Sequence, residues 1–297
     1  MPSLRSYLFR TIIRATLPLT TSTTSIPKLR ARMGAISGKS FLPRGVTLSP
    51  VKLDGVPAEW IYPPNYSPQS IILYLHGGAW TLGWTNTGRS LLAYISLAAH
   101  SRALAVDYRL APEHPFPAAH TDCFKAYCWL LSNGILPKNI VLAGDSAGGN
   151  LVLTTLLALR DAGLPLPGAA VCISAVTDLA CTGESFQTKK DPGLPTNFVR
   201  TMIQHYIGSQ DPLQPLISPL YADLTGFPPL LMQVGEDELL LSDSVRLADK
   251  ARNAGVDVQL VVWPKMWHVW HTSVPILPEA QKAVNEIGAF ILERIAR

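Results

Sequence analysis

The sequence predicts an α/β fold with a mostly parallel central sheet. Short continuous apolar runs, which are typical of buried strands, alternate with helix-like segments from residue 71 onward. Strands that alternate with helices imply crossover connections, and these connections make neighbouring strands parallel. The chain has 297 residues, of which 47% are hydrophobic and 15% charged, so it can bury a sizeable core. This length suits one large α/β domain or two small ones.

The expected elements follow one another with short connections. The expected strands lie at residues 71–75, 103–106, 140–143, 169–174, 229–234 and 258–262. The expected helices lie at residues 91–99, 117–131, 150–160, 242–253 and 278–296. An earlier pair of segments, at residues 46–53 and 58–62, predicts an antiparallel hairpin at the sheet edge.

Two segments fall outside this alternation. One is residues 1–45, and the other is the Pro- and Gly-rich tract 179–228, in which we expect a helix at 197–207. Open α/β sheets bind their ligands at the carboxyl ends of the strands. We therefore expect a main domain over residues 46–297, with both segments forming a helical cap over that edge.

The start of the chain is strongly basic. Leu4, Leu8, Ile12 and Ile13 fall roughly on one face of a helix. Three interpretations stay open: a helix that caps the site, contact of residues 1–20 with a membrane or lipid surface, or a cleaved targeting segment. No Asp or Glu precedes Asp54, whereas nine basic residues do: Arg5, Arg10, Arg14, Lys28, Arg30, Arg32, Lys39, Arg44 and Lys52.

Composition argues against several classes of protein. The net charge of +4 is modest and no aromatic-basic motif occurs, so we expect no nucleic-acid partner. No apolar run reaches the roughly 18 residues that a membrane span needs. The spacing of the cysteines matches no common zinc site, so we expect no bound metal. We expect these cysteines to be reduced thiols in the core, which is typical of a cytoplasmic protein. These cysteines are Cys123, Cys128, Cys172 and Cys181.

A nucleophile motif follows the strand at residues 140–143. The segment GDSAG, residues 144–148, has the G-x-S-x-G pattern and leads into an apolar helix. Such a turn lifts Ser146 above the sheet in a strained conformation, and the flanking glycines avoid a clash. Free N–H groups at the helix start can also stabilise a developing anion. We therefore predict that Ser146 is a catalytic nucleophile.

A second motif follows the strand at residues 71–75. The segment HGGAW, residues 76–80, places glycines directly after a strand. Glycines let the backbone approach a ligand closely, and their N–H groups can then stabilise an oxyanion. This loop is the expected partner of Ser146 in acyl transfer.

Three blocks together resemble the hormone-sensitive lipase group of esterases, also called bacterial HSL or family IV esterases. They are HGGAW (76–80), DYRLAPEHPFPAA (107–119) and GDSAGGN (144–150), and the resemblance covers about residues 46–295. It implies the α/β-hydrolase fold, with residues 46–297 as the catalytic domain and a cap insertion at about 179–228. It also implies that Glu113, in the second block, supports the loops rather than reacting.

The resemblance assigns an oxyanion hole to backbone N–H groups. Ala79 stands where the family usually has Gly, so its methyl group narrows the loop if the backbone there needs a positive φ. His76 resembles the histidine that anchors this loop in the family. The expected donors are three of the four N–H groups of Gly77, Gly78, Ala79 and Ala147.

The acid of the triad should follow the strand that ends near residue 234, because the chain order in this fold is Ser, acid, His. The segment VGEDELLLSD offers several carboxylates. Relatives have the acid three residues after a glycine, and the same count from Gly235 gives Glu238. Asp237 remains the alternative, whereas Glu236 and Asp243 are expected to be loop and helix-cap carboxylates.

The base should follow the last strand, at residues 258–262. The segment MWHVW resembles the family pattern G-M-x-H-x-F/W and predicts His268 as the base. Lys265 stands where the family usually has Gly. His271 is expected to line the pocket or to cap the following segment.

These residues predict a serine carboxylester hydrolase that forms an acyl-enzyme and needs no cofactor. An aromatic-lined pocket formed by Trp80, Trp84 and Trp267 suits short- to medium-chain acyl esters. A lipase, a lactonase or a deacetylase of a specific metabolite ester would look the same, and a non-catalytic ligand-binding relative is a further alternative. Members of the resembled family often form homodimers through the edge strand, which makes a homodimer possible here.

Overall fold

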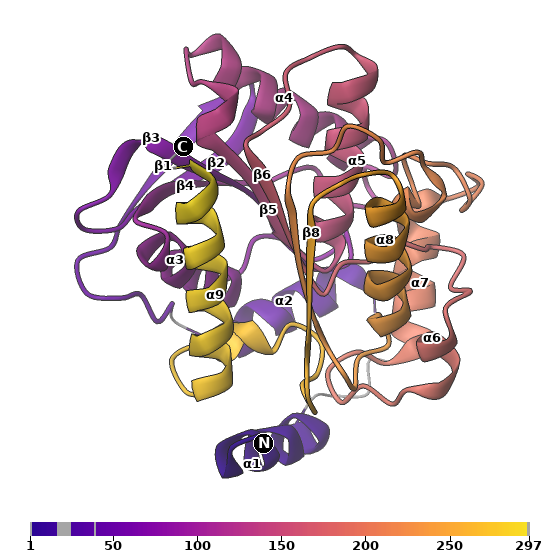
Figure 1. Cartoon of the computed structure of the whole chain (residues 1–297). Coiled ribbons are helices and arrows are strands. Elements are labelled where there is room, and N and C mark those ends of the chain that lie inside the picture. The colour runs from indigo at the N-terminus through magenta and orange to yellow at the C-terminus, as the bar shows by residue number, and fades with distance from the viewer. Residues whose placement is uncertain (1, 17–24, 39, 296–297) are drawn as a thin grey trace.

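The computed structural model describes residues 2–16, 25–38 and 40–295, and they form a sheet flanked by helices on both faces (Figure 1). The sheet has eight strands in the order β1-β2-β4-β3-β5-β6-β7-β8. The pairs β1–β2 and β2–β4 are antiparallel, and all other neighbours are parallel. This arrangement confirms the predicted α/β fold with an antiparallel hairpin at one edge.

The strands agree with the expected apolar runs to within a few residues. The largest difference is at β3, which begins four residues early because Ser67 pairs with Ser101 across an irregularity in the register. The strands are β1 (Thr47–Leu53), β2 (Val56–Tyr62), β3 (Ser67–Leu75), β4 (Ser101–Val106), β5 (Ile140–Asp145), β6 (Ala169–Ile173), β7 (Leu230–Gly235) and β8 (Val258–Trp263).

Three flanking helices begin earlier than their apolar runs: α3 at residue 86 instead of 91, α5 at 147 instead of 150 and α8 at 241 instead of 242. Thr85 caps α3 by accepting a hydrogen bond from the N–H of Gly88, so α3 starts in a polar segment. The last predicted residue of the final helix, 296, lies outside the described residues. The helices that flank the sheet are α3 (Asn86–Ala98), α4 (Ala118–Ser132), α5 (Ala147–Asp161), α8 (Leu241–Asn253) and α9 (Pro278–Ile295).

Two hydrophobic layers lie on opposite faces of the sheet. Side chains alternate between the faces along each strand, so Leu73 and Leu75 pack with α4, α5 and α8, whereas Ile72 and Tyr74 pack with α3 and α9. Every one of these four strand residues is fully buried. The central strands are therefore apolar on both faces, which explains their continuous hydrophobic runs.

Both segments that break the alternation form helices, and we refer to these described parts, residues 2–16, 25–38 and 179–228, as the cap. Residues between β6 and β7 form α6 (Glu184–Thr188) and α7 (Thr196–Ile207), and the start of the chain adds α1 (Leu4–Thr16) and α2 (Ile26–Ser37). Figure 1 places α1 at the edge of the molecule, apart from the sheet. None of the described helices is long and apolar enough to cross a membrane.

Part of the predicted apolar face of α1 packs against the core. Leu4, Leu8 and Ile12 of that face are 89%, 65% and 45% exposed, whereas Ile13 packs against the core together with Phe9, which the prediction did not include. Phe9 stacks on Trp267, with ring centroids 6.2 Å apart. The sequence shows the spacing of apolar residues but not which of two adjacent apolar stripes meets a partner. Residues 17–20, the end of the segment considered for lipid contact, lie outside the described residues.

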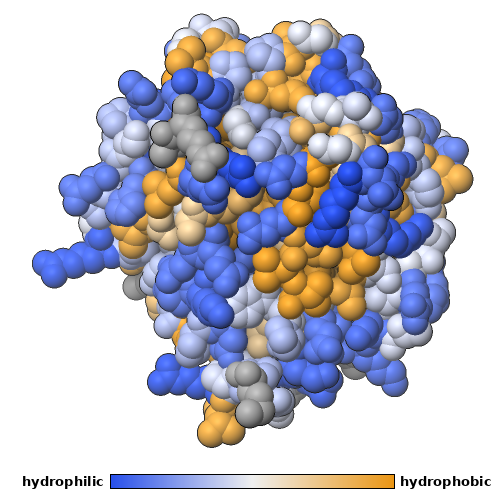
Figure 2. Space-filling model, in the orientation of Figure 1, coloured by the Kyte–Doolittle hydropathy of each residue, from blue (hydrophilic) through white to orange (hydrophobic). Residues whose placement is uncertain are grey.

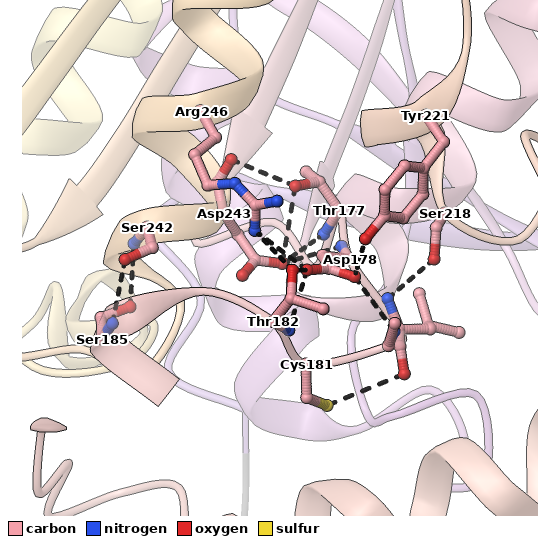
Figure 3. A network of polar contacts seen from close by, with 12 residues as sticks. Thr177, Asp178, Cys181, Thr182, Ser185, Ser218, Tyr221, Ser242, Asp243 and Arg246 are labelled. Atoms are coloured by element: carbon pink, nitrogen blue, oxygen red, sulfur yellow. Dashed lines mark hydrogen bonds and ion pairs between the residues drawn. The ribbon is translucent and has the colours of Figure 1, made fainter. Parts of the chain in front are cut away.

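A polar network fastens the start of the cap insertion to α8 (Figure 3). Asp178 accepts hydrogen bonds from the N–H groups of Ala180 and Thr182 and pairs with Arg246 of α8. Asp243 accepts hydrogen bonds from the N–H groups of Thr177 and Asp178 through one oxygen, Oδ2. These hydrogen bonds and the ion pair fix the segment that follows β6 against α8. The cap insertion is therefore anchored beside the carboxyl edge of the sheet.

Candidate active site

Ser146 occupies a sharp turn between β5 and α5. Its backbone has φ 54° and ψ −118°, a conformation that non-glycine residues rarely adopt. The N–H of Ser146 donates to the carbonyl of Ile173 on the neighbouring strand at 2.8 Å. A Cβ on Gly148 would lie 1.9 Å from the carbonyl oxygen of Leu75, so only glycine fits there. The motif thus forms the predicted strained turn.

His268 joins Ser146 to a buried carboxylate. Its Nε2 lies 2.9 Å from Oγ of Ser146, and its Nδ1 lies 3.1 Å from Oε2 of Glu238. The three residues follow β5, β7 and β8 at the same edge of the sheet. This is the geometry of a hydroxyl, an imidazole and a carboxylate that can transfer a proton from the nucleophile.

Glu238 and Asp237, the two candidate acids, have different surroundings. Glu238 is fully buried, and its Oε1 accepts hydrogen bonds from Oγ of Ser174 and from the N–H of Gly235, both at 2.7 Å. Asp237 instead forms an ion pair with Arg10 of α1. The geometry therefore favours Glu238.

The charges around His268 favour its protonated form. Burial alone would lower the pKa of His268, but the hydrogen bond and charge of Glu238 outweigh it. The charges of Asp191 and Asp145 act in the same direction, and the resulting pKa lies above the ordinary value of 6.5. Such surroundings stabilise the imidazolium that forms when the histidine removes a proton.

In the described part of the chain, three backbone donors near Ser146 are free: two in the loop at residues 76–80, here called the oxyanion loop, and one at the start of α5. The N–H of Gly77 already donates to Oδ1 of Asp145 at 2.9 Å, so this group is used within the protein. The N–H groups of Gly78 and Ala79 have no acceptor in the described part of the chain, and that of Ala147 opens α5. The geometry thus leaves three of the four expected donors. Ala79 has φ 52°, so its methyl group occupies a position that favours glycine.

Asp145 and His76 stabilise the position of this loop. Asp145 accepts a second hydrogen bond, from the Tyr74 hydroxyl at 2.6 Å, and so ties the loop to the nucleophile turn. His76 stacks on Tyr108 with ring centroids 4.2 Å apart, and burial lowers its pKa to about 4. A neutral, packed imidazole fits the anchoring role that the family resemblance implies.

A cavity of about 230 Å³ opens over Ser146. Its wall is mostly apolar and comes from both parts of the cap: Leu29, Arg32 and Met33 of α2, and Gly193, Leu194, Pro195 and Phe198 of the insertion. The oxyanion loop region after β3, the nucleophile turn at the end of β5 and the segment after β8 (residues 264–272, the histidine loop) supply the remaining lining: Gly78, Ala79, Leu82, Asp145, Ser146, His268, Val269 and Thr272.

None of the three tryptophans of the predicted aromatic pocket lines the cavity over Ser146. Trp80 is buried and stacks on Tyr206 of α7 at 4.4 Å, and Trp267 is buried against Phe9. Trp84 lines an adjoining cavity of about 240 Å³ together with His76. Packing partners distant in sequence decide where these large rings go.

His271 also lies outside the cavity, whereas the sequence suggested that it lines the pocket or caps the following segment. It is fully buried, and its Nε2 lies 2.8 Å from Oε1 of Gln233. Burial lowers its pKa to about 3, so the ring is neutral. It is a core histidine.

Sequence reasoning missed Arg30 of α2, which fastens the N-terminal cap. Its guanidinium forms two hydrogen bonds with Glu113, at 2.8 and 2.7 Å. It also donates to the carbonyls of Thr81 and Ala111 at 2.7 and 2.9 Å. Glu113 thus has the structural role that the family resemblance implies, and its partner comes from 83 residues earlier.

Ser174 was missed as well. Besides donating to Glu238, its Oγ accepts a hydrogen bond from the N–H of Val269 at 3.3 Å. It therefore connects the acid to the residue that follows His268. No local motif marks it; its place at the end of a predicted central strand was the available signal.

Among the described residues, no group of His, Cys, Asp or Glu is arranged to hold a metal ion.

Comparisons with known proteins agree with this fold. A family model described as the alpha/beta hydrolase fold matches residues 72–272. An acetyl-hydrolase of Streptomyces hygroscopicus is 47% identical over 236 residues, 79% of each chain. An esterase of Acinetobacter venetianus is 38% identical over 248 residues, 82% of each chain.

Solved structures give the same result over nearly the whole chain. An esterase from the bacterial hormone-sensitive lipase (HSL) family is 43% identical, has a TM-score of 0.94 and is matched over 99% of both chains. The structure of EstE5 soaked with p-nitrophenyl butyrate is 40% identical, with a TM-score of 0.95, over 99% of this chain and 100% of that one. The chain therefore belongs to the α/β-hydrolase family, among the esterases that resemble hormone-sensitive lipase.

Proposed function

We propose that this protein hydrolyses carboxylic esters of short acyl chains, with Ser146 as nucleophile, His268 as base and Glu238 as the acid that orients the base. The 2.9 Å contact between Nε2 of His268 and Oγ of Ser146 carries the proposal. Both side chains line the cavity of about 230 Å³, and three free backbone N–H groups lie beside them.

The reaction proceeds through an acyl-enzyme. His268 removes the proton of Ser146, whose oxygen attacks the ester carbonyl, and the N–H groups of Gly78, Ala79 and Ala147 stabilise the oxyanion. His268 then protonates the alcohol, which leaves. Water enters, gives its proton to His268 and attacks the acyl-enzyme. As the bond between the acyl carbon and Oγ of Ser146 breaks, His268 returns the proton to Oγ, and the carboxylic acid departs.

The size of the cavity supports short acyl chains. Pockets that hold drug-sized ligands measure about 300–1,000 Å³, so a space of about 230 Å³ suits a small acyl group. Leu29, Leu194 and Phe198 give it an apolar wall. The similarity to an acetyl-hydrolase and to an esterase soaked with p-nitrophenyl butyrate supports the same choice.

The test is Ser146→Ala measured with p-nitrophenyl esters from acetate to palmitate. We expect wild-type kcat/KM to be highest between acetate and hexanoate, and the variant to lose about 10³-fold or more. A covalent fluorophosphonate should label the wild type at Ser146. Near-wild-type turnover by Ser146→Ala would refute the nucleophile, and no labelling of the folded wild type would favour a ligand-binding protein.

We also propose a homodimer formed through β8. This strand is the last in the sheet and, among the described strands, pairs only with β7. Its side chains remain partly exposed, with Val262 at 40%, and Figure 2 shows an apolar patch in this region. Val262→Lys places a charge in the proposed interface, so light scattering should then give the mass of one chain instead of two.

Contact of α1 with a lipid surface is a third proposal. Leu4, Tyr7 and Leu8 are exposed, and α1 carries Arg5 and Arg14 with no acidic residue. Co-sedimentation with anionic vesicles should decrease in the variant Leu4→Ser/Leu8→Ser. Unchanged binding in this variant would remove α1 from consideration.

The free, mostly buried cysteines support a cytoplasmic location for the protein.

A further inference from the structure

Asp191 connects the cap to the histidine loop. It lies between α6 and α7, and its Oδ2 accepts a hydrogen bond from the backbone N–H of His268 at 3.1 Å. Its Oδ1 accepts one from the N–H of Gly193 at 2.8 Å. Gly193 lines the cavity over Ser146. One carboxylate therefore joins the backbone that carries the imidazole to the wall of the acyl pocket.

The histidine loop needs such support because its backbone is strained. Val269, the next residue, has φ 48° and ψ 44°, a left-handed conformation that is unfavourable for a β-branched side chain. Two successive N–H groups of this loop are held: that of His268 by Asp191 of the cap, and that of Val269 by Ser174 of the main domain. Strained backbone persists only where surrounding contacts determine it, and these two contacts do so.

The cap loop between α6 and α7, residues 189–195, lies next to the histidine loop. A Cβ placed on Gly193 would lie 3.7 Å from Cδ1 of Trp267 and 3.9 Å from the carbonyl oxygen of His268, so the space between the two loops has room for about one methyl group. The two hydrogen bonds of Asp191 are partly buried, and partial burial strengthens them relative to bonds in open solvent.

Three carboxylates act on the charge of His268: Glu238 from the β7 side, Asp145 beside the nucleophile and Asp191 from the cap. Burial opposes the imidazolium, and these negative charges outweigh it. Burial raises the pKa of Asp191 itself to about 7, against the attraction of His268. Asp191 is the member of this group that comes from the cap.

We propose that Asp191 is a positioning residue. It holds the imidazole of His268 at hydrogen-bonding distance from Oγ of Ser146, and it makes that position depend on the cap loop at the pocket wall. This inference rests on the proposed ester hydrolysis. It assigns Asp191 no contact with the substrate. Its carboxylate acts through the backbone of His268 and through its negative charge.

Two substitutions separate these effects. In Asp191→Asn the amide cannot replace both oxygens, because each oxygen accepts from a different N–H, so one bond is lost together with the charge. Asp191→Glu keeps the charge but places it on a longer side chain. Asp243→Asn is the matched control: both backbone bonds of Asp243 go to a single oxygen, so the amide keeps them and removes only a buried charge at the base of the cap.

We expect kcat with p-nitrophenyl butyrate to decrease about 10- to 100-fold in Asp191→Asn. The acidic limb of the kcat/KM profile should move to lower pH, because the lost negative charge lowers the pKa of His268. Asp191→Glu should lower kcat while its acidic limb stays near the wild-type pH. Asp243→Asn should leave both quantities within about twofold of wild type.

Circular dichroism first establishes that each variant is folded. If Asp191→Asn is poorly folded, the pH dependence of fluorophosphonate labelling in its folded fraction gives the same readout. Wild-type kcat and an unmoved limb in Asp191→Asn would overturn the inference, as would an equal loss in Asp243→Asn without any shift. An inactive, unlabelled wild type would instead refute the proposed function, so the two failures are distinguishable.

Discussion

The exchange of Glu238 for Gln tests the candidate triad most sharply. In the wild type, Oε1 of Glu238 accepts from the N–H of Gly235 and from Oγ of Ser174, and Oε2 faces Nδ1 of His268. The backbone N–H of Gly235 can only donate. A Gln side chain must therefore turn its carbonyl toward Gly235 and its NH₂ group toward His268.

This orientation determines the tautomer of the histidine. An NH₂ group beside Nδ1 requires Nδ1 to accept, so the proton moves to Nε2, which then cannot remove the proton of Ser146. A wrong tautomer in such a triad costs about 10⁴-fold in kcat, which corresponds to about 5 kcal/mol in the activation barrier. We expect a loss of this size for Glu238→Gln with p-nitrophenyl butyrate, and little change in KM.

Asp237→Asn is the matched comparison. Its ion pair with Arg10 is partly exposed, so its loss should cost less than about 1 kcal/mol of stability. We expect kcat to stay within about threefold of wild type. Stopped-flow and steady-state rates measured on both folded variants decide the question. A Glu238→Gln enzyme with more than a tenth of wild-type kcat, or a larger loss in Asp237→Asn, would falsify the reasoning.

Three further predictions follow from the same geometry. Because the pKa of His268 is raised and its neutral form is the base, kcat/KM should fall as pH decreases through a value above 6.5, which a pH profile measures directly. Ser174→Ala removes one donor to Glu238 and one acceptor for the histidine loop, so kcat should drop about tenfold while KM changes little; an unchanged kcat would exclude this support. Phe198→Ala removes a large side chain from the pocket wall and so enlarges the pocket. The preferred p-nitrophenyl ester should then have a longer acyl chain, since each additional methylene that the pocket buries contributes about 0.8 kcal/mol to binding. An unaltered chain-length profile would place the acyl group elsewhere.

The parts of the site that local patterns encode were predictable. The GDSAG turn needs glycine where a Cβ would strike a neighbouring strand, and that requirement is visible in the letters themselves. Counting three residues from Gly235 led to Glu238, which the structure brings within hydrogen-bond distance of His268. Alternating apolar runs likewise predicted the sheet, because a strand buried on both faces must be continuously apolar.

Tertiary structure alone decided which large or charged side chains meet. Trp80 turned to Tyr206 and Trp267 to Phe9, since each ring packs against a partner more than a hundred residues away. Asp191 contacts a histidine 77 residues later in the chain, and no local signal could pair them. Periodicity records that a side chain is apolar or charged, whereas its neighbour depends on how distant segments fold together, and that information lies in no single stretch of the sequence.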